Sequence, residues 1–205
     1  MKKTLKTILI TILTIFLFTL LSLFIFSCAP QQSVQRVSFD QKIDLSGRWN
    51  DTDSWETAKD LITQILNDRW ISNFHRDNGN ERPKVIVGLV KNRSHEHIDA
   101  ETFIKDMEKA FIKTGAIRLI QGGEKREEIR YEREDQQGNA LPSTVKQWGR
   151  ELGADFILQG SINSIVDEVQ NQMVIYYQID LELTNLETNE VVWIGDEKIK
   201  KLVRK

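Results

Sequence analysis

Cysteine and histidine are scarce in this chain of 205 residues. It has one cysteine, Cys28, and three histidines. A single cysteine excludes a disulfide framework and any zinc site built from four thiolates. Three histidines leave little material for a metal centre or a catalytic triad. The composition therefore disfavours the enzyme classes that depend on these side chains.

An excess of basic residues is also lacking. The chain has 28 Lys and Arg against 30 Asp and Glu, which gives a net charge of -2 and a pI near 6.0. A protein that binds nucleic acid without regard to sequence normally carries a basic stripe, so we expect no nucleic-acid partner. The length suits one domain with accessory segments, and 40% hydrophobic residues are enough for one core.

The sequence also lacks several known catalytic and phosphate-binding motifs. His95 and His97 have no third metal ligand close in the sequence, and a solvated loop is the simpler interpretation. Gly122-Gly123 is not part of a longer glycine motif, and Glu124 would repel an anion there. No serine stands in Gly-x-Ser-x-Gly, and no carboxylate pair stands in an apolar setting. We expect a protein that is not an enzyme and that has no metal or cofactor.

The N-terminal segment contains the one long apolar run. Residues 8–26 carry no charge, Lys2, Lys3 and Lys6 precede them, and Ser27 follows. A basic start, an apolar stretch and a small residue at its end are the parts of a bacterial secretory signal. The 19 residues of the run also approach the roughly 20 that a spanning helix needs. A cleaved signal and an uncleaved membrane anchor both remain open from this pattern.

The position of the cysteine distinguishes these two possibilities. Ile25-Phe26-Ser27-Cys28 resembles the lipobox of bacterial lipoproteins, in which the thiol is lipidated and the cysteine becomes the N-terminus. This resemblance implies a lipoprotein signal peptide over residues 1–27 and lipidation of Cys28. Several acyl chains together would hold the protein firmly on a membrane. The alternative is a chance cysteine at the end of a spanning helix.

A short polar segment separates this anchor from the rest of the chain. Residues 28–44 show no periodicity and contain one proline, Pro30, so we expect a tether. Fully extended, the tether would reach about 55 Å, and as a flexible coil about 25 Å. Residues 45–205 form the expected globular domain, and Trp49 at its start is a candidate to dock the tether or to contact a partner.

The first half of this domain predicts alternating helices and strands. Asp53 and Glu56 predict a helix start, and the apolar spacing continues to Trp70 with Trp55 on the core side. The run Val85–Val90 has the composition of a buried strand. Asp99 and Gly115 predict the two ends of a second helix, and residues 117–120 a short strand.

The second half predicts an exposed helix, a buried helix and three strands. Residues 124–135 are charged on all sides, whereas Val145, Trp148 and Leu152 have the spacing of a helix from about residue 143 to 152 that faces the core. Strict alternation from Met173 to Leu183 predicts a half-buried strand. The expected fold class is α/β: a mixed sheet flanked by helices, with a C-terminal antiparallel meander.

Four segments in this order resemble the LpoB family of lipoproteins that activate penicillin-binding proteins. The resemblance covers nearly the whole chain from about Asp44 to Lys200 and implies a fold similar to the N-terminal domain of TolB. It rests on the segments Asp44-Leu-Ser-Gly-Arg-Trp-Asn-Asp-Thr-Asp-Ser54, Val90-Lys-Asn-Arg-Ser94, Gly153-Ala-Asp-Phe-Ile-Leu158 and Glu187-Thr-Asn-Glu-Val-Val-Trp-x-Gly195.

The resemblance also implies a function and a partner. A member of this family would be a monomeric, non-enzymatic regulator that is anchored in the outer membrane, faces the periplasm and contacts a class A penicillin-binding protein. We expect the partner to meet Asn92 and Arg93 after the first strand, or the side that bears Lys146 and Arg150. The short tether departs from the long proline-rich arm of well-known members, which leaves an inner-membrane anchor as an alternative. A structural lipoprotein of an envelope assembly, similar to CsgG, is the alternative function and would form a ring.

Overall fold

The chain divides into two units, residues 1–41 and 42–205. The computed structural model describes residues 2–25, 33–38 and 41–204, and Cys28 lies outside these ranges. The first unit contains helix α1 (Lys2–Ile25). Among the residues that the structure describes, no helix is both long enough and apolar enough to cross a membrane.

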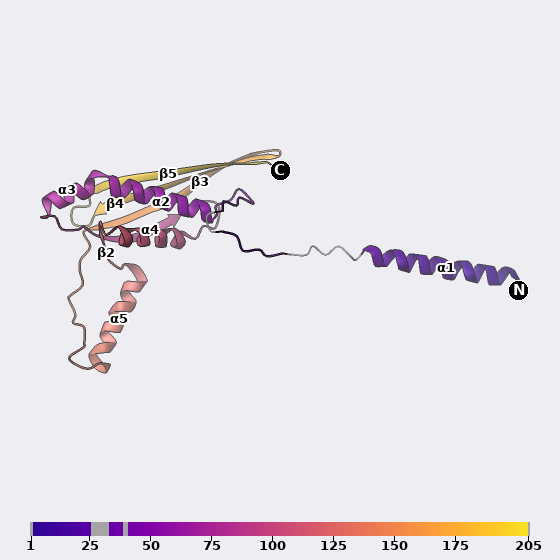
Figure 1. Cartoon of the computed structure of the whole chain (residues 1–205), viewed down its shortest axis with the longest axis horizontal. Helices are drawn as coiled ribbons and strands as arrows, with labels where there is room; N and C mark the ends of the chain where they lie inside the picture. Colours follow the sequence, from indigo (N-terminus) through magenta and orange to yellow (C-terminus); the bar gives the residue numbers. More distant parts are fainter. Residues whose placement is uncertain (1, 26–32, 39–40, 205) are drawn as a thin grey trace. The chain divides into compact units, whose positions relative to one another are not determined.

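A five-stranded mixed sheet forms the second unit (Figure 1). The strand order is β2-β1-β3-β4-β5, in which β1 runs parallel to both of its neighbours and β4 runs antiparallel to β3 and β5. This arrangement confirms the predicted mixed sheet with a C-terminal meander. The strands are β1 (Lys84–Asn92), β2 (Arg118–Leu119), β3 (Phe156–Val169), β4 (Gln172–Asn185) and β5 (Val191–Arg204).

Three helices and one face of the sheet enclose the core. They are α2 (Asp51–Asn67), α3 (Arg69–Asp77) and α4 (Ala100–Thr114). The alternation predicted for β4 is confirmed, because the odd-numbered residues from 175 to 183 are at most 1% exposed. The largest fully buried side chains are Tyr177, Phe103, Phe111, Leu61, Ile65, Met107, Leu158, Ile162, Ile175, Ile179, Leu181 and Leu183.

The first helix of the second unit starts earlier than predicted. Asn50 is its N-cap: the Asn50 side chain accepts a hydrogen bond from the Asp53 backbone, and the Asp53 carboxylate accepts one from the Asn50 backbone. The predicted start at Asp53 was therefore three residues late, because Asn50 and Asp53 form the capping box together. The buried stripe of α2 leaves Trp55 42% exposed, with Lys59 5.2 Å above its ring, so the prediction that Trp55 faces the core was wrong.

The helix also ends earlier than its apolar spacing suggested. Asp68 has an extended backbone and caps a separate helix, α3, by accepting a hydrogen bond from the Trp70 backbone. Trp70 is nevertheless buried, and its ring nitrogen donates to the Ile65 carbonyl. The predicted ends of α4 are confirmed: Asp99 caps its start, and Gly115, with a φ of 66°, closes it in the left-handed conformation.

Trp193 covers a glycine on the core side of β5. A Cβ atom at Gly195 would lie 2.2 Å from the Trp193 ring, so only glycine leaves room for the indole. Trp193 is 6% exposed and belongs to the hydrophobic core between the sheet and the helices. The Gln64 side chain donates to the Asp196 carbonyl and joins α2 to the same strand.

The last three strands continue beyond the helices as a ribbon, drawn in orange and yellow in Figure 1. Gln170, with a φ of 49°, lies in the tight turn between β3 and β4. Side chains at this end are largely exposed, among them Ile165, Val169 and Leu202. The ribbon has no helix to pack against, so its stability depends on the hydrogen bonds of the three strands.

One segment projects from the body, and we call residues 123–153 the arm (Figure 1). Helix α5 (Gly123–Asn139) has no buried residue, which confirms the predicted charged surface. The helix predicted from residue 143 to 152 is wrong: this stretch is irregular, and Trp148 and Leu152 are about half exposed. Gly149 has a φ of 70°, which an α-helix cannot contain. Nothing lies within 4 Å of the Cβ position of Gly153, so no close packing requires a glycine there.

Candidate partner-binding site

Asn92, the first candidate, builds the loop that follows β1. Its amide nitrogen donates to the carbonyl of Glu96 at 2.8 Å, and its carbonyl oxygen accepts from the backbone and the hydroxyl of Ser94. These hydrogen bonds give Asn92 a structural role in the loop. Its polar groups are thus already used within the loop.

Arg93, the second candidate, remains available to a partner. Its backbone donates to the Ile162 carbonyl at 2.8 Å, which fixes its position beside β3. Its side chain is exposed and has no hydrogen bond or ion pair with any residue that the structure describes. A guanidinium on a fixed backbone is well suited to bind a carboxylate.

Glu96, in the same loop, is a residue whose role the sequence analysis missed. Its carboxylate accepts from the Tyr177 hydroxyl at 2.8 Å and from the Trp49 backbone at 3.1 Å. Burial, together with the hydrogen bond to Glu96, raises the pKa of Tyr177. The Trp49 ring meets the Tyr177 ring edge-on at 5.5 Å. The loop is therefore tied to the core, and the Trp49 backbone is fixed beside it.

Lys201 connects the first residues of the second unit to its last strand. Its ammonium lies 2.7 Å from the Asp44 carboxylate, 2.6 Å from that of Asp53 and 3.1 Å from the Arg48 carbonyl. Burial lowers the pKa of Lys201, but the hydrogen bonds to the two carboxylates outweigh it and the pKa is raised overall. The Lys201 ammonium in turn lowers the pKa of Asp44. We call this contact the latch.

Lys146 and Arg150, the other two candidates, lie on the arm. The backbone of Lys146 is held by the side chains of Gln136 and Gln137 on α5. The side chains of Lys146 and Arg150 are exposed and make no hydrogen bond or ion pair with the described residues. Two unpaired cations therefore lie on the irregular segment of the arm that follows α5.

Glu151 holds the arm closed. Its carboxylate accepts hydrogen bonds from Arg130, at 3.0 and 3.1 Å, and from Arg133 at 2.7 Å. These bonds lower the pKa of Glu151 to about 2. Because both arginines lie on α5, Glu151 fixes the irregular segment alongside the helix.

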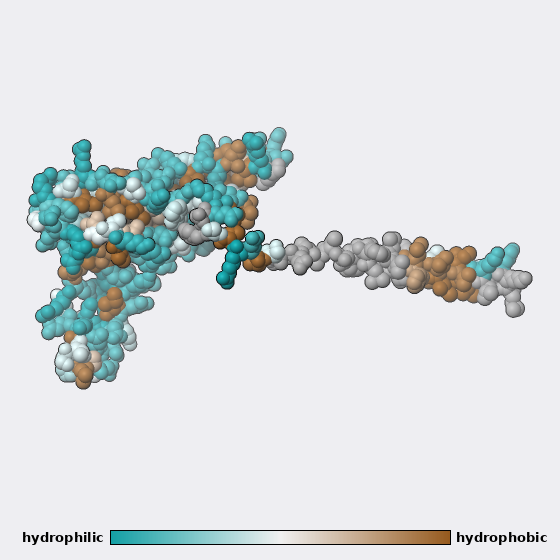
Figure 2. Space-filling model, in the orientation of Figure 1, coloured by the Kyte–Doolittle hydropathy of each residue, from teal (hydrophilic) through white to brown (hydrophobic). Residues whose placement is uncertain are grey.

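Large apolar side chains are exposed on the same arm. Figure 2 shows small brown patches on the arm within a mostly teal and white surface. Because none of these side chains is buried against the body, the arm gains little stability from packing. Exposed apolar side chains near unpaired charges are typical of interaction surfaces. The exposed fractions are 74% for Tyr131, 71% for Leu141, 52% for Trp148 and 47% for Ile129 and Leu152.

The structure does not bring the two pairs of candidates together. Asn92 and Arg93 lie where β1 ends, whereas Lys146 and Arg150 precede Phe156, which pairs with the beginning of β1. No hydrogen bond or ion pair among the described residues joins one pair to the other. They are two separate surfaces, and the arm has the larger supply of unpaired groups.

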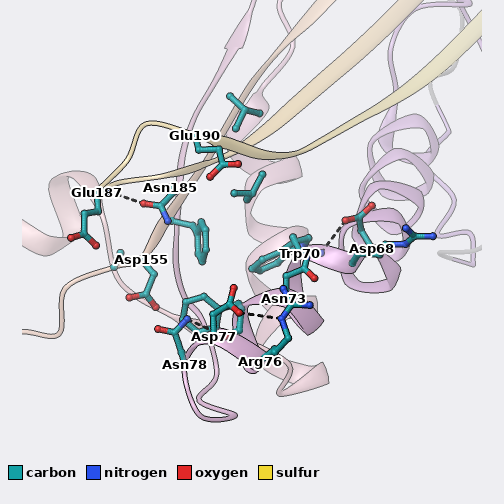
Figure 3. Close-up of a pocket in the computed structure, with 16 residues that line it drawn as sticks. Asp68, Trp70, Asn73, Arg76, Asp77, Asn78, Asp155, Asn185, Glu187 and Glu190 are labelled. Carbon is teal, nitrogen blue, oxygen red and sulfur yellow. Dashed lines mark hydrogen bonds and ion pairs between the residues drawn. The ribbon is translucent and has the colours of Figure 1, made fainter.

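A cavity of about 750 Å³ was not anticipated from the sequence (Figure 3). It lies between α3, the beginning of β3 and the turn between β4 and β5, and aromatic rings form part of its wall. Two of the segments that carried the resemblance contribute to its lining, through Ala154, Asp155, Phe156, Glu187, Glu190, Val191 and Val192. No group of three or more potential metal ligands occurs among the residues that the structure describes.

Comparison with known protein families gives a match over most of the chain. A family model described as peptidoglycan-synthase activator LpoB matches residues 53–199. No curated protein matches the sequence significantly.

Similar solved structures include two LpoB C-terminal domains. The one from Salmonella enterica is 17% identical with a TM-score of 0.41, and the one from Escherichia coli is 15% identical with a TM-score of 0.43. Each comparison covers 73% of this chain and 99% of the other. Lipoprotein GNA1162 from Neisseria meningitidis is 12% identical over 59% of this chain and 83% of its own, with a TM-score of 0.35. Since these scores lie below 0.5, the inference of function depends on the family match.

Proposed function

The chain belongs to the LpoB family of peptidoglycan-synthase activators, and we propose that it is a lipid-anchored envelope protein that binds and activates a class A penicillin-binding protein. The family match over residues 53–199 carries this proposal, because it spans nearly all of the second unit. The chain would regulate peptidoglycan synthesis and would itself perform no chemistry.

The proposed anchor is the lipid on Cys28. In this proposal residues 1–27 are a signal peptide that is removed, residues 28–44 are the tether and residues 45–205 are the working domain, which faces the periplasm. Ala29 follows the cysteine where an Asp commonly signals retention in the inner membrane, so the outer membrane is the proposed location. The short tether makes an anchor in the inner membrane the alternative outcome.

To activate the synthase, this chain has to bind its active and inactive conformations with different affinities. A ligand shifts a conformational equilibrium only if it binds one state more tightly than the other. A tenfold increase in the active population of the synthase corresponds to about 1.4 kcal/mol of differential binding. A preformed surface of this chain therefore has to fit the active conformation of the synthase better than the inactive one.

The arm is the surface that we propose for this contact. It presents Lys146, Arg150 and Trp148 together on a segment that Glu151 holds in place. The unpaired cations would bind carboxylates of the synthase, and the exposed rings would bury apolar area against it. Arg93 lies on a separate surface and would contribute only if the partner reached both.

The test combines the full chain in detergent micelles with a purified class A synthase and measures glycan polymerisation against activator concentration. The double variant Lys146→Glu/Arg150→Glu should need at least tenfold more protein for half-maximal stimulation. The matched control is Lys113→Glu/Lys200→Glu, which reverses the charge of two exposed lysines. Their side chains make no hydrogen bond or ion pair with the described residues. The control should behave like the parent chain.

The possible results distinguish a wrong function from a wrong binding surface. If the parent chain does not stimulate any class A synthase of its own organism, the proposed function is wrong. If the parent chain stimulates the synthase but the two double variants lose stimulation to the same extent, the arm is not the specific contact.

A further inference from the structure

Aromatic rings form the inner wall of the cavity beside α3. Trp70 and Phe74 each meet the Phe156 ring edge-on, at 5.3 and 5.5 Å between centroids. Phe74 is partly buried, and the almost fully buried Trp70 and Phe156 hold its ring in a rigid apolar wall. Such a surface suits the methylene stem of a long side chain.

The rim of the cavity is mostly acidic. Five carboxylates and two guanidinium groups line it. Three of the carboxylates have partners within the protein: Asp155 pairs with Lys84 at 3.0 Å, Asp77 pairs with Arg76 at 3.1 Å, and Asp68 caps α3.

Two carboxylates of the rim are left without partners. The Glu187 and Glu190 side chains make no hydrogen bond or ion pair with the described residues, and both belong to the turn between β4 and β5. Figure 3 shows Glu190 on the edge of the hollow, across from Arg76 and Asp77 on α3. Arg69 is the one cation of the lining without a partner in the described residues, so the unpaired charge of the rim is negative.

We propose that this cavity binds a basic side chain, arginine or lysine, of an extended peptide segment in a partner protein. The stem would lie along the aromatic wall at Phe74, which Trp70 and Phe156 back, and the cationic head would reach Glu187 and Glu190. Asn73, whose amide makes no hydrogen bond in the described residues, lies on the rim and is available to the peptide backbone.

The volume favours a peptide over a single small ion. About 750 Å³ is within the range of 300–1,000 Å³ that is usual for ligand sites, and it exceeds what one side chain fills. The turn that carries both glutamates is also well fixed, because the Asn185 side chain accepts hydrogen bonds from the backbones of Glu187 and Thr188. The site is independent of the arm, so it holds or fails separately from the proposed function.

The test uses the full chain in micelles, labelled with ¹⁵N-tryptophan, and follows the indole signal of Trp70 by NMR. That signal is identified by its loss in Trp70→Phe. The probes are acetyl-Ala-Arg-Ala-amide and the same peptide with citrulline, which has the shape of arginine without its charge. The arginine peptide should shift the Trp70 signal with at least fivefold higher affinity than the citrulline peptide, and added salt should weaken it.

Paired variants then assign the effect to the two glutamates. Glu187→Gln/Glu190→Gln should lower the affinity for the arginine peptide at least fivefold, whereas Glu128→Gln/Glu182→Gln, two exposed carboxylates elsewhere, should leave it unchanged. Unchanged indole signals of the other tryptophans show that each variant is folded. Equal binding of both peptides, no shift at tens of millimolar, or an equal loss in the two variants would each overturn the proposal.

Discussion

At the scale of single residues, Lys201 makes the most consequential polar contact. It holds the carboxylates of Asp44 and Asp53, and Asp53 is 8% exposed. Removing the ammonium leaves a buried carboxylate without its cation, which costs about 1–3 kcal/mol. We expect Lys201→Met to lower the free energy of unfolding by that amount, measured by urea denaturation of the full chain in micelles.

The neighbouring lysine provides the control for the latch. Lys200 lies on the opposite face of β5 and is exposed. Its side chain makes no hydrogen bond or ion pair with the described residues. Lys200→Met should change the free energy of unfolding by less than about 0.5 kcal/mol. Equal values for the two variants would show that the latch does not stabilise the fold.

Glu151 gives a prediction about pH. Its hydrogen bonds from Arg130 and Arg133 lower its pKa from the usual 4.5 to about 2. A carboxyl whose pKa is depressed by folding stabilises the folded state above its unfolded pKa, and this contribution is lost as the pH falls through the folded pKa. The arm should therefore lose this stabilisation progressively below about pH 4.5 and should open as the pH approaches 2.

An NMR titration of the Glu151 side-chain carboxyl measures this pKa directly. Arg130→Gln removes the largest cause of the shift, so the midpoint should move up towards 4.5. A midpoint near 4.5 in the parent chain would mean that the arm is open in solution.

Residue roles were predictable where the partners are close in the sequence. Asp99 and Gly115 could be assigned as helix ends because capping depends on residues two or three positions away. Glu96 and Glu151 were missed because their partners lie far along the chain: Tyr177 is 81 residues from Glu96, and Arg130 is 21 from Glu151. The cavity escaped prediction for the same reason, since three distant segments form it.

At the scale of elements, the arm behaves as an insertion between β2 and β3. None of the residues of α5 is buried, and the surrounding strands are fixed by β1, to which Ile120 and Asp155 both hydrogen bond. Replacing residues 123–153 by a short Gly-Ser linker should therefore preserve the fold. The shortened chain should fold but should no longer stimulate the synthase.

Circular dichroism and thermal unfolding of the full chain in micelles check the first half of this prediction. The melting temperature should fall by only a few degrees, because no core contact is removed. A chain that aggregates or melts without cooperativity would show that the arm is part of the folding unit. Retained stimulation would place the contact elsewhere.

Elements were predictable where side-chain periodicity reflects burial on one side. The alternation from Met173 to Leu183 gave the correct strand because one face of the sheet is covered and the other is not. The same logic failed from residue 143 to 152, where the spacing of Val145, Trp148 and Leu152 imitated a buried helix. A glycine in the left-handed conformation and hydrogen bonds to α5 decide the conformation there, and neither is visible in hydrophobic spacing.

At the scale of the whole molecule, the proposed regulator should act as a monomer. Size-exclusion chromatography with light scattering on the full chain in micelles should give the mass of one chain after subtraction of detergent. A stable ring of many copies would contradict the activator and would favour the structural lipoprotein of an envelope assembly.

The anchor gives the second prediction at this scale. The chain recovered from membranes should begin at Cys28 and carry acyl chains, as intact-mass spectrometry would show. Cys28→Ala should keep the leader and lose the lipid. A parent chain that retains residues 1–27 with an unmodified thiol would rule out the lipoprotein.

The latch between Asp44 and Lys201 also decides how a mechanical load enters the domain. Any pull transmitted along the N-terminal segment reaches an ammonium near the end of an outer strand before it reaches the hydrophobic interior. Lys42, which precedes Asp44, pairs with Glu56 on α2, so the same pull would load α2 as well as β5. These ion pairs would give way first, and the hydrophobic core would bear a load only after they had broken.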